Sequence, residues 1–406
     1  MFDRVFRAFQ YRDFRLMWIG ACTSSIGTWM QSTAQSWLIY DLSNDVRYLG
    51  WDRFLGEIPI VLLSLFGGVL ADRVNRRYIL LASQVLQMTC ATVLTILLVT
   101  GVVAKGNPRV WPILCISFFV GIAQAFGGPA YSALVPSLVG KEDLPNAISL
   151  NSIQFNLARV IGPTLGGIAL QKLGAQWCFG LNALSFVAVI ISLVIVRPLF
   201  VPKKSTEGVF EAMGKGLQFI RARQAMIPLI ALSFLMTFLS VNILQFLPEF
   251  VKKTLHSGTN AFTMLLVASG AGSVFGALAV AALAKRKHLG TTSLVALMGL
   301  GLVITAFSFS RWLPTSLLFM FLGGAALIGV FAMVMSMVQT IVTDDMRGRV
   351  MSVYNLALRG GFPIGALVSG YLIPVLTLPV VLAIDGVALA ALGGFFLLFN
   401  RKVATL

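Results

Sequence analysis

Long apolar stretches of this sequence contain ionisable side chains, which are its first candidates for chemistry. They are Asp52, Arg53, Glu57, Arg159, Arg359 and Asp385. A charge inside a membrane-spanning helix costs at least about 2.5 kcal/mol, so such residues pair with one another or serve a function. A carboxylate there can take up and release a proton, and a guanidinium can bind that carboxylate or another anion. The expected chemistry is therefore proton exchange and ion pairing.

The spacing of these residues allows more than one arrangement. Arg53 and Glu57 are four residues apart and can neutralise each other on one helix. At 1.5 Å per residue, Glu57, Arg159 and Arg359 each lie about 20 Å from the cytoplasmic end of their stretch, so pairs between helices are also allowed. The two arginines can instead bind an anionic substrate directly. The residues alone leave these alternatives open.

The amino-acid composition indicates that these stretches lie in lipid. The chain of 406 residues is 57% hydrophobic and 11% charged, with a mean hydropathy of +0.87, which leaves too little polar surface for a water-soluble globule. The stretches are about 20 residues or longer, as a hydrocarbon core requires. We expect an all-α membrane protein with twelve transmembrane helices near 15–40, 47–71, 78–101, 110–133, 146–170, 178–197, 225–249, 260–284, 291–310, 314–340, 346–374 and 380–400.

Basic residues indicate the orientation of these helices. Most Lys and Arg fall in loops on one side, the asymmetry of the positive-inside rule. With an even number of crossings, both termini of this multi-pass protein are expected in the cytoplasm, at the cell (inner) membrane. The net charge of +16 is scattered over short loops, so no nucleic-acid partner is expected. The four cysteines show no CxxC spacing, and neither a metal site nor a cofactor is expected.

The two halves of the chain resemble each other. ARVIGPTLGG aligns with LRGGFPIGAL, so that Arg159 matches Arg359 and Pro163 matches Pro363. Parallel halves related by an axis along the membrane normal are typical of one large class of transporters. We expect two pseudo-symmetric six-helix bundles joined by a cytoplasmic linker, with the bundles at 1–200 and 225–406 and the linker at 201–224.

The segment GGVLADRVNRR closes the second expected helix. It resembles the signature loop of the major facilitator superfamily. Its glycines let a neighbouring helix approach, and its arginines anchor the turn in the cytoplasm. Asn75 replaces the usual glycine and tolerates a left-handed turn. The alternative is that these basic residues only mark the end of a membrane-spanning helix. The resemblance implies a cytoplasmic gate formed by Gly68, Asp72, Arg73, Arg76 and Arg77.

The fifth expected helix contains GPTLGG, which resembles the core of the antiporter signature of that superfamily. Its residues are Gly162, Pro163, Gly166 and Gly167. The glycines permit close packing, and the proline removes one backbone hydrogen bond and bends the helix. A generic kinked packing helix is the alternative. Free N–H groups are expected to be capped before this helix by Glu142 and Asp143, and before the eleventh by Thr343, Asp344 and Asp345.

The resemblance extends over nearly the whole chain through SSIGTWMQ, DLPNAISLNSIQFNLARVIGP and DDMRGRVMSVYNLAL. These segments are similar to the branch that contains enterobactin exporters and macrolide efflux proteins, which implies an exporter driven by a proton gradient. In that architecture the second and eleventh helices meet, so Glu57 and Arg359 are expected to form an outer gate. Asp52, Arg53 and Arg159 are further candidates for proton coupling. Asp385, on a peripheral helix, is expected to be a buried hydrogen-bonded acid.

The same architecture implies a substrate cavity lined by the first, fourth, seventh and tenth helices. Aromatic and methionine side chains suit varied apolar ligands, and amides orient polar edges. Ordinary helix packing is nevertheless the commoner role of such residues. The candidates are Trp29, Gln31, Gln35, Gln124, Phe126, Asn242, Gln245, Met333 and Met337.

These observations predict a secondary transporter that exports amphipathic or hydrophobic small molecules, such as a drug or a siderophore, in exchange for protons. It is expected to act as a monomer surrounded by membrane lipid. A lysolipid or solute importer of the same fold is the alternative. An enzyme is not expected, because the two histidines lie in loops and no nucleophile and base are spaced together in the apolar stretches.

Overall fold

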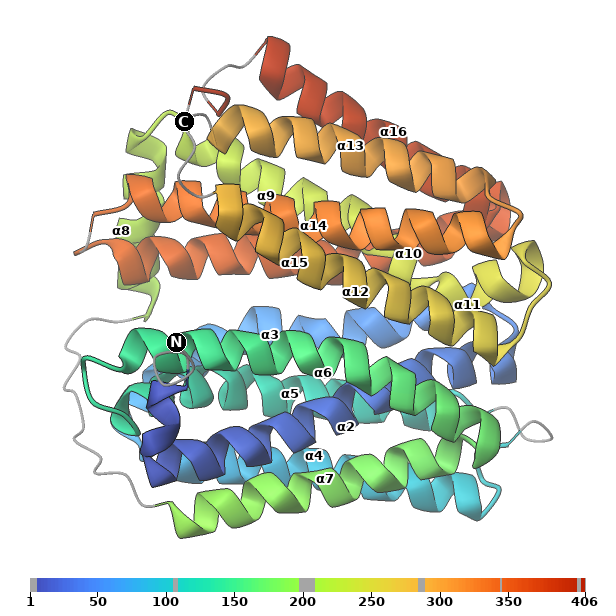
Figure 1. Ribbon diagram of the computed structural model, residues 1–406, viewed down its shortest axis with the longest axis horizontal. Coiled ribbons are helices and arrows are strands. Elements are labelled where there is room, and N and C mark those ends of the chain that lie inside the picture. Colours follow the sequence, from blue (N-terminus) through green and yellow to red (C-terminus); the bar gives the residue numbers. More distant parts are fainter. Residues whose placement is uncertain are drawn as a thin grey trace. The chain divides into compact units, whose positions relative to one another are not determined.

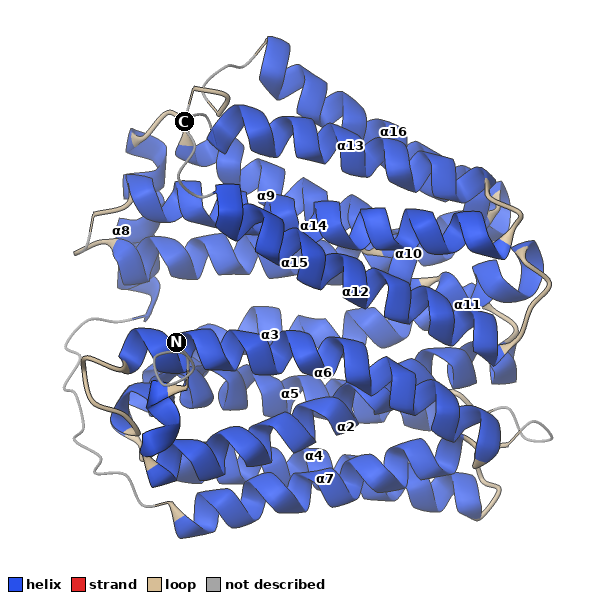
Figure 2. Ribbon diagram, viewed as in Figure 1, coloured by secondary structure: helices blue, strands red, loops and turns tan. Residues whose placement is uncertain are grey.

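The computed structural model describes residues 6–104, 109–196, 209–283, 289–343, 345–399 and 403–405. These residues are almost entirely helical (Figure 2), and each of the twelve expected apolar stretches falls on helical structure. By their internal contacts the residues divide into two compact units. Unit 1 comprises Met1–Asn44 and Ile58–Thr206, and unit 2 comprises Asp45–Glu57 and Glu207–Leu406.

Unit 1 is a bundle of long helices that run side by side (Figure 1). Within it, α2 packs against α6 and α7, while α4 packs against α5 and α7. The bounds are η1 (Arg7–Gln10), α2 (Arg12–Ser43), α3 (Val46–Arg73, of which residues 58–73 belong here), α4 (Arg76–Val99), α5 (Trp111–Leu134), η2 (Val135–Ser137), α6 (Leu144–Lys172) and α7 (Ala175–Ile195).

Unit 2 repeats this packing order. There α9 packs against α15 and α16, while α13 packs against α14 and α16, so the same four helix pairs occur in the same sequence order in both units. The bounds are α8 (Val209–Ala222), α9 (Met226–Ser240), α10 (Asn242–Gln245), α11 (Leu247–Glu249), the π-helix η3 (Phe250–Thr254), α12 (Thr259–Leu283), α13 (Leu289–Phe309), α14 (Leu313–Ile341), α15 (Arg347–Leu376) and α16 (Leu378–Leu398).

Helix α8 lies in the segment that the sequence predicts as a linker. Residues 201–208 of that segment are outside the described part of the chain, and α8 occupies most of the rest. α8 packs against α15, where Gly216 faces the backbone of Arg349. A Cβ at Gly216 would lie 2.7 Å from the Arg349 carbonyl oxygen, so the glycine allows this close approach.

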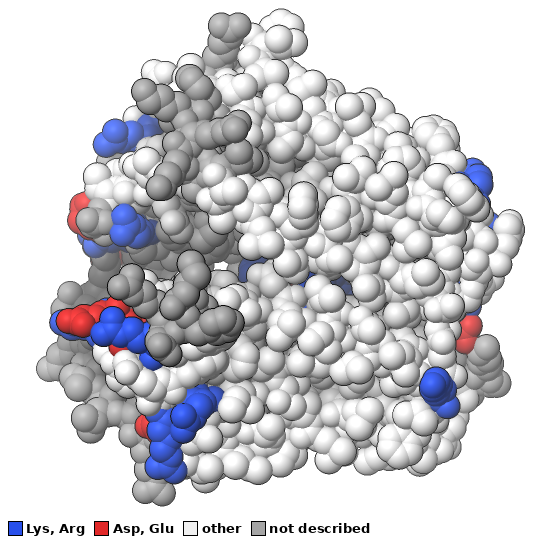
Figure 3. Space-filling model, in the orientation of Figure 1, with Lys and Arg blue, Asp and Glu red and all other residues white. Residues whose placement is uncertain are grey.

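Length and hydropathy identify ten helices in the described part of the chain that can cross a membrane. They include α3, α4, α5 and α7 in the first half of the sequence, together with six in the second half. α2 and α6 are as long, but they carry more polar side chains along their length. On the face in Figure 3, the sides of the helices are uncharged except for small basic patches near the middle, and most charged residues gather toward the helix ends, as expected for a protein embedded in lipid.

Glycines of the antiporter-like segment bring α6 close to α2. A Cβ added at Gly166 would lie 2.9 Å from the carbonyl oxygen of Met30 and 3.1 Å from its Cα. A Cβ at Gly162 would meet the Cβ of Trp29 and lie 2.9 Å from the carbonyl oxygen of Ile26. In lipid, helices associate through such close packing because no hydrophobic driving force acts between them.

We expect Gly166→Ala to destabilise the protein by about 1–3 kcal/mol, because the added methyl group forces the backbones of α6 and α2 apart. Gly128→Ala on α5 is the matched control, since its added Cβ meets no heavy atom within 4 Å. Thermal unfolding of the purified protein in detergent measures both. Equal unfolding temperatures for the two variants would show that Gly166 is not a packing constraint.

Candidate functional site

The first turns of α3 are fastened to unit 2 by polar contacts. Nε2 of Gln245 on α10 donates a hydrogen bond of 2.7 Å to the carbonyl oxygen of Leu49. Nε1 of Trp51 donates one of 3.2 Å to the hydroxyl of Tyr371 on α15. Gly50 faces the backbone of Ala366 closely. Segment 45–57 therefore packs with helices that follow it by about two hundred residues or more, although the rest of α3 belongs to unit 1.

Glu57 ends this segment, and its carboxylate is shared between two arginines. Its Oε1 lies 3.2 Å from Nη2 of Arg53, one turn earlier on α3, and its Oε2 lies 3.2 Å from Nη1 of Arg359 on α15. The Glu57 side chain is only 14% exposed, against 47% for Arg359. The local pair and the interhelical pair, which the sequence leaves as alternatives, are thus both present.

Aromatic and backbone features complete this cluster. The guanidinium carbon of Arg53 lies 5.3 Å from the ring centre of Phe362 on α15, which adds a cation–π contact. Asp52 precedes it on α3 and is half-buried. Pro59 follows Glu57 inside the helix and removes the backbone hydrogen bond to the carbonyl of residue 55. The helix therefore lacks one backbone hydrogen bond near the point where it passes from unit 2 to unit 1.

Arg159 has a different environment from Arg359, its match in the repeat. It lies near the middle of α6, and its guanidinium carbon is 5.9 Å from the ring centre of Trp29 on α2. Within the described part of the chain it forms no ion pair. Trp29 also contacts Phe155, one turn before Arg159, in a T-shaped arrangement with ring centres 6.0 Å apart.

Asp385 on α16 is buried and hydrogen-bonded, in the manner expected from the sequence. Its Oδ2 accepts a bond of 2.8 Å from Nδ2 of Asn242, which is completely buried. Asn242 begins α10, directly after the break that ends α9 at Ser240. Its Oδ1 has no hydrogen-bond partner among the described residues. The pair thus ties α16 to an interruption of the kind found where transporter helices bind solutes and ions.

The loop between α3 and α4 is bound to the ends of α5 and α7 in unit 1. Arg76 donates to the carbonyl oxygen of Ala133 at 2.7 Å, near the end of α5, and lies 3.6 Å from Asp72. Arg77 donates to the carbonyl oxygens of Leu193 and Val194 at the end of α7. Arginines at these positions satisfy carbonyls that have no partner within their helix and favour the negative helix ends.

Two expectations about this loop need correction. Gly67 faces the backbone of Ala125 on α5, but a Cβ added at Gly68 would meet no heavy atom within 4 Å, so the close approach expected at both glycines is found at Gly67 alone. Asn75 does not adopt a left-handed conformation, since its φ is −59°. It caps α4 instead, because its side chain accepts from the backbone N–H of Arg77 at 3.0 Å. Arg73 is exposed.

The capping expected of acids before two helices is also not found. Asp143 stands at the N-cap of α6 but makes no capping bond. Its carboxylate instead lies 3.0 Å from Nε of Arg7 and accepts from Gln10 and Tyr11, which binds η1 to the bundle. α15 likewise has no side-chain cap, and Asp344 lies outside the described residues. A hydrogen bond from Thr343 lowers the pKa of Asp345.

The expected cavity residues have mixed surroundings. Gln31, Asn242, Met333 and Met337 are buried, and Gln31 accepts a hydrogen bond of 2.6 Å from Asn182 on α7. Gln35 donates to Ser117 at 2.9 Å. Trp29, Gln124, Phe126 and Gln245 are half-buried. Most of the amides therefore hold helices together within their own unit.

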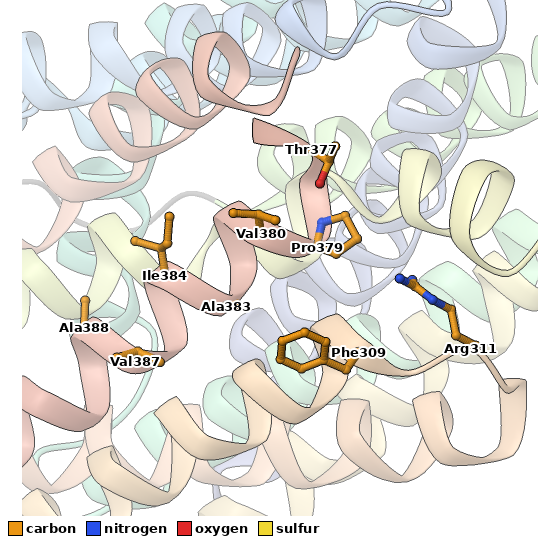
Figure 4. Close-up of a pocket in the computed structure, with 9 residues that line it drawn as sticks. All are labelled: Phe309, Arg311, Thr377, Pro379, Val380, Ala383, Ile384, Val387 and Ala388. Carbon is orange, nitrogen blue, oxygen red and sulfur yellow. The ribbon is translucent and has the colours of Figure 1, made fainter. Parts of the chain in front are cut away.

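An apolar pocket lies elsewhere in unit 2, between the end of α13 and the start of α16 (Figure 4). None of the six membrane-embedded charged residues lines it. Arg311 is the one charged residue in its lining, which consists of Phe309, Arg311, Thr377, Pro379, Val380, Ala383, Ile384, Val387 and Ala388.

Comparison with known proteins identifies the family. The model of the transmembrane secretion effector family matches residues 5–405. The chain belongs to this family, which is of the major facilitator type. It is a multi-pass membrane transporter.

Curated relatives of this transporter are efflux proteins. It is 23% identical to the multidrug efflux pump Tap of Mycolicibacterium fortuitum, over 87% of this chain and 88% of that protein. It is 26% identical to the enterobactin exporter of Salmonella typhi, over 82% and 79% of the two chains. The macrolide efflux protein A of Streptococcus pyogenes is 23% identical over 88% of each.

Solved structures share the fold of this transporter. An inward-facing, unoccupied bacterial homologue of the human lysosomal transporter Spinster superimposes with a TM-score of 0.75 at 13% identity, over 97% of each chain. A peptide transporter superimposes with a TM-score of 0.76 at 14% identity, over 97% of this chain and 95% of that one. At such low identity these likenesses concern the fold alone.

Sequence reasoning missed two hydrogen bonds between distant residues of this transporter. It named Asn242 and Asp385 separately but did not join them, and it did not find the bond between Trp51 and Tyr371. The one signal in the sequence for the change of unit within α3 is Pro59, two residues after Glu57 in an apolar stretch.

We expect Asn242→Leu to lower the stability of this transporter by about 1–3 kcal/mol, because it leaves the buried Asp385 carboxylate without its donor. Asp385→Asn is the matched variant. Its new amide can still accept from Nδ2 of Asn242 and can also donate to the unpartnered Oδ1, so we expect it to be at least as stable as the native protein. Thermal unfolding in detergent compares them. An equal loss of stability in both variants would contradict this assignment.

Proposed function

We propose that this transporter exports amphipathic or hydrophobic small molecules, such as a drug or a siderophore, in exchange for protons. Its relatives support export, since they are a multidrug efflux pump, an enterobactin exporter and a macrolide efflux protein. The observation that carries the coupling proposal is the Glu57 carboxylate shared by Arg53 and Arg359.

The proposed architecture is two six-helix bundles with twelve membrane crossings. In it α2 and α6 cross the membrane together with the ten more apolar helices. The recurrence of the same four helix pairs in both units supports this arrangement. Both termini would lie in the cytoplasm at the cell (inner) membrane, and the protein would act as a monomer among membrane lipids.

Glu57 is the proposed proton acceptor and outer gate. While it is ionised, its carboxylate holds segment 45–57 to α15 through Arg359. Protonation removes the negative charge and leaves Arg53 and Arg359 without their shared partner, so the segment is released. Substrate binding can release it in the same way by favouring the open state. Pro59 then provides the joint at which the outer turns of α3 move.

The cytoplasmic gate is proposed at the opposite end of α3. There Arg76, which pairs with Asp72, and Arg77 bind the ends of α5 and α7, which would keep the cytoplasmic part of unit 1 rigid. A rigid cytoplasmic end and a proline joint in the same helix suit alternating access, in which bundles move as bodies around a central site.

Transport in proteoliposomes tests the function. In vesicles with an acidic lumen, we expect a fluorescent substrate added to the medium to accumulate in the lumen. Molecules inserted with their cytoplasmic side toward the medium would take up the substrate there and release it into the lumen in exchange for luminal protons. The panel should contain dyes, siderophores, macrolides and lysolipids. Glu57→Gln should abolish the dependence on the pH gradient, whereas Asp385→Asn should retain it. Accumulation that persists without a gradient, or runs only in the direction of import, would contradict proton-coupled export.

Charge reversal tests the gate separately. We expect Glu57→Arg and Arg359→Glu each to reduce the transport rate about tenfold or more, since each places like charges together. The double variant should recover most of the loss, because the two exchanged side chains again carry opposite charges. Arg53→Gln is the control for the local pair and should cost less than either reversal. A double variant no better than the single variants would refute the gate.

A further inference from the structure

Arg159 lies so deep in α6 that its side chain cannot reach water at either membrane surface. It lies about 20 Å from both ends of α6 at 1.5 Å per residue, which is much longer than an arginine side chain. Long basic side chains near helix ends reach the interface, but one at mid-helix needs an anion, a polar cavity or an aromatic face. Its surroundings therefore indicate what it binds.

The described helices of unit 1 offer this cation no carboxylate at its depth. Among the described residues of the long helices of unit 1, the acids lie near helix ends: Asp13 in the first turn of α2, Asp41 in the last, and Asp72 at the end of α3. Asp72 lies 3.6 Å from Arg76. Asp143, before α6, binds Arg7. The positive charge of Arg159 is therefore not balanced by the described residues of its unit.

The matching residue of the other half shows that the position can carry a counter-ion. Arg359 occupies the same place in the repeat and lies 3.2 Å from the carboxylate of Glu57. Arg159 lies instead beside the ring of Trp29 at 5.9 Å. The repeat thus holds two arginines in equivalent positions, and of these only Arg359 has a carboxylate partner among the residues that the structure describes.

Aromatic side chains form a wall beside Arg159. Trp29 and Phe155 are in T-shaped contact, and the Phe155 side chain is largely exposed. Trp29 packs directly against Gly162, one turn after Arg159, which fixes the position of the Trp29 side chain. The site therefore presents one positive charge next to apolar aromatic surface.

We propose that Arg159, Trp29 and Phe155 form a site for the anionic group of an amphipathic aromatic substrate. The guanidinium would bind a carboxylate, phenolate or sulfonate through charge-assisted hydrogen bonds, and the rings would stack on the aromatic body. This proposal rests on the proposed function in that the ligand is a transported molecule. It narrows the substrate class from amphipathic compounds in general to aromatic anions.

Equilibrium binding of a matched probe pair tests this site. The probes are 2-naphthoate and the neutral 2-naphthamide, which share the aromatic body and differ in charge. Isothermal titration of the purified full chain in detergent should show a preference of about tenfold or more for the carboxylate. Arg159→Gln should abolish most of this preference while changing the affinity for the amide less than about threefold. Arg159→Lys should retain part of it, because the charge remains.

Arg109→Gln is the matched control, since Arg109 is an exposed arginine outside this site, and it should keep the preference for the carboxylate. Unfolding temperatures of all variants show whether each is folded. A folded Arg159→Gln variant that still prefers the carboxylate, or a native protein with no preference for it, would overturn the site. Because binding in detergent needs no proton gradient, failure of proton-coupled transport and failure of this site give separate results.

Discussion

The structure depends on one shared carboxylate. In an apolar setting the charge of Glu57 is tolerated only beside cations, and the fold supplies one from its own helix and one from α15, each at 3.2 Å. Because Arg359 follows Glu57 by three hundred residues, this interaction joins the start of the chain to its end. Segment 45–57, which Gln245 and Tyr371 also contact, packs in unit 2, and α3 passes into unit 1 between Glu57 and Ile58, two residues before Pro59.

The repeat gives two similar frameworks with different electrostatics. α6 and α15 occupy equivalent places in the packing of the two units, and both carry an arginine at the same register. Arg359 is neutralised by Glu57, whereas Arg159 lies against Trp29 without a carboxylate from the described residues of its unit. Arg359 thus pairs with Glu57 on segment 45–57, whereas in our proposal Arg159 binds a ligand.

Most helices could be predicted from the sequence because a hydrocarbon core imposes their length. The predicted stretch 178–197 corresponds to α7 at Ala175–Ile195, and 260–284 corresponds to α12 at Thr259–Leu283. Partners between distant helices were harder to predict, because they depend on the rotation of each helix about its axis. The hydrogen bond from Asn242 to Asp385 and the difference between Gly67 and Gly68 both arise from such rotation. The capping role of Asn75 depends on its side-chain direction, which the sequence does not fix.

The measurement that tests the central claim most directly is a distance between segment 45–57 and α15. Nitroxide labels at Tyr48 and Val375, both exposed, report it by double electron–electron resonance in a variant lacking the native cysteines. The account predicts a short, narrow distribution in the otherwise native protein at neutral pH. It predicts an added population at longer distances after Glu57→Gln, while Asp385→Asn leaves the distribution unchanged. An identical short distribution with and without the Glu57 charge would contradict the claim that this carboxylate holds the segment in place.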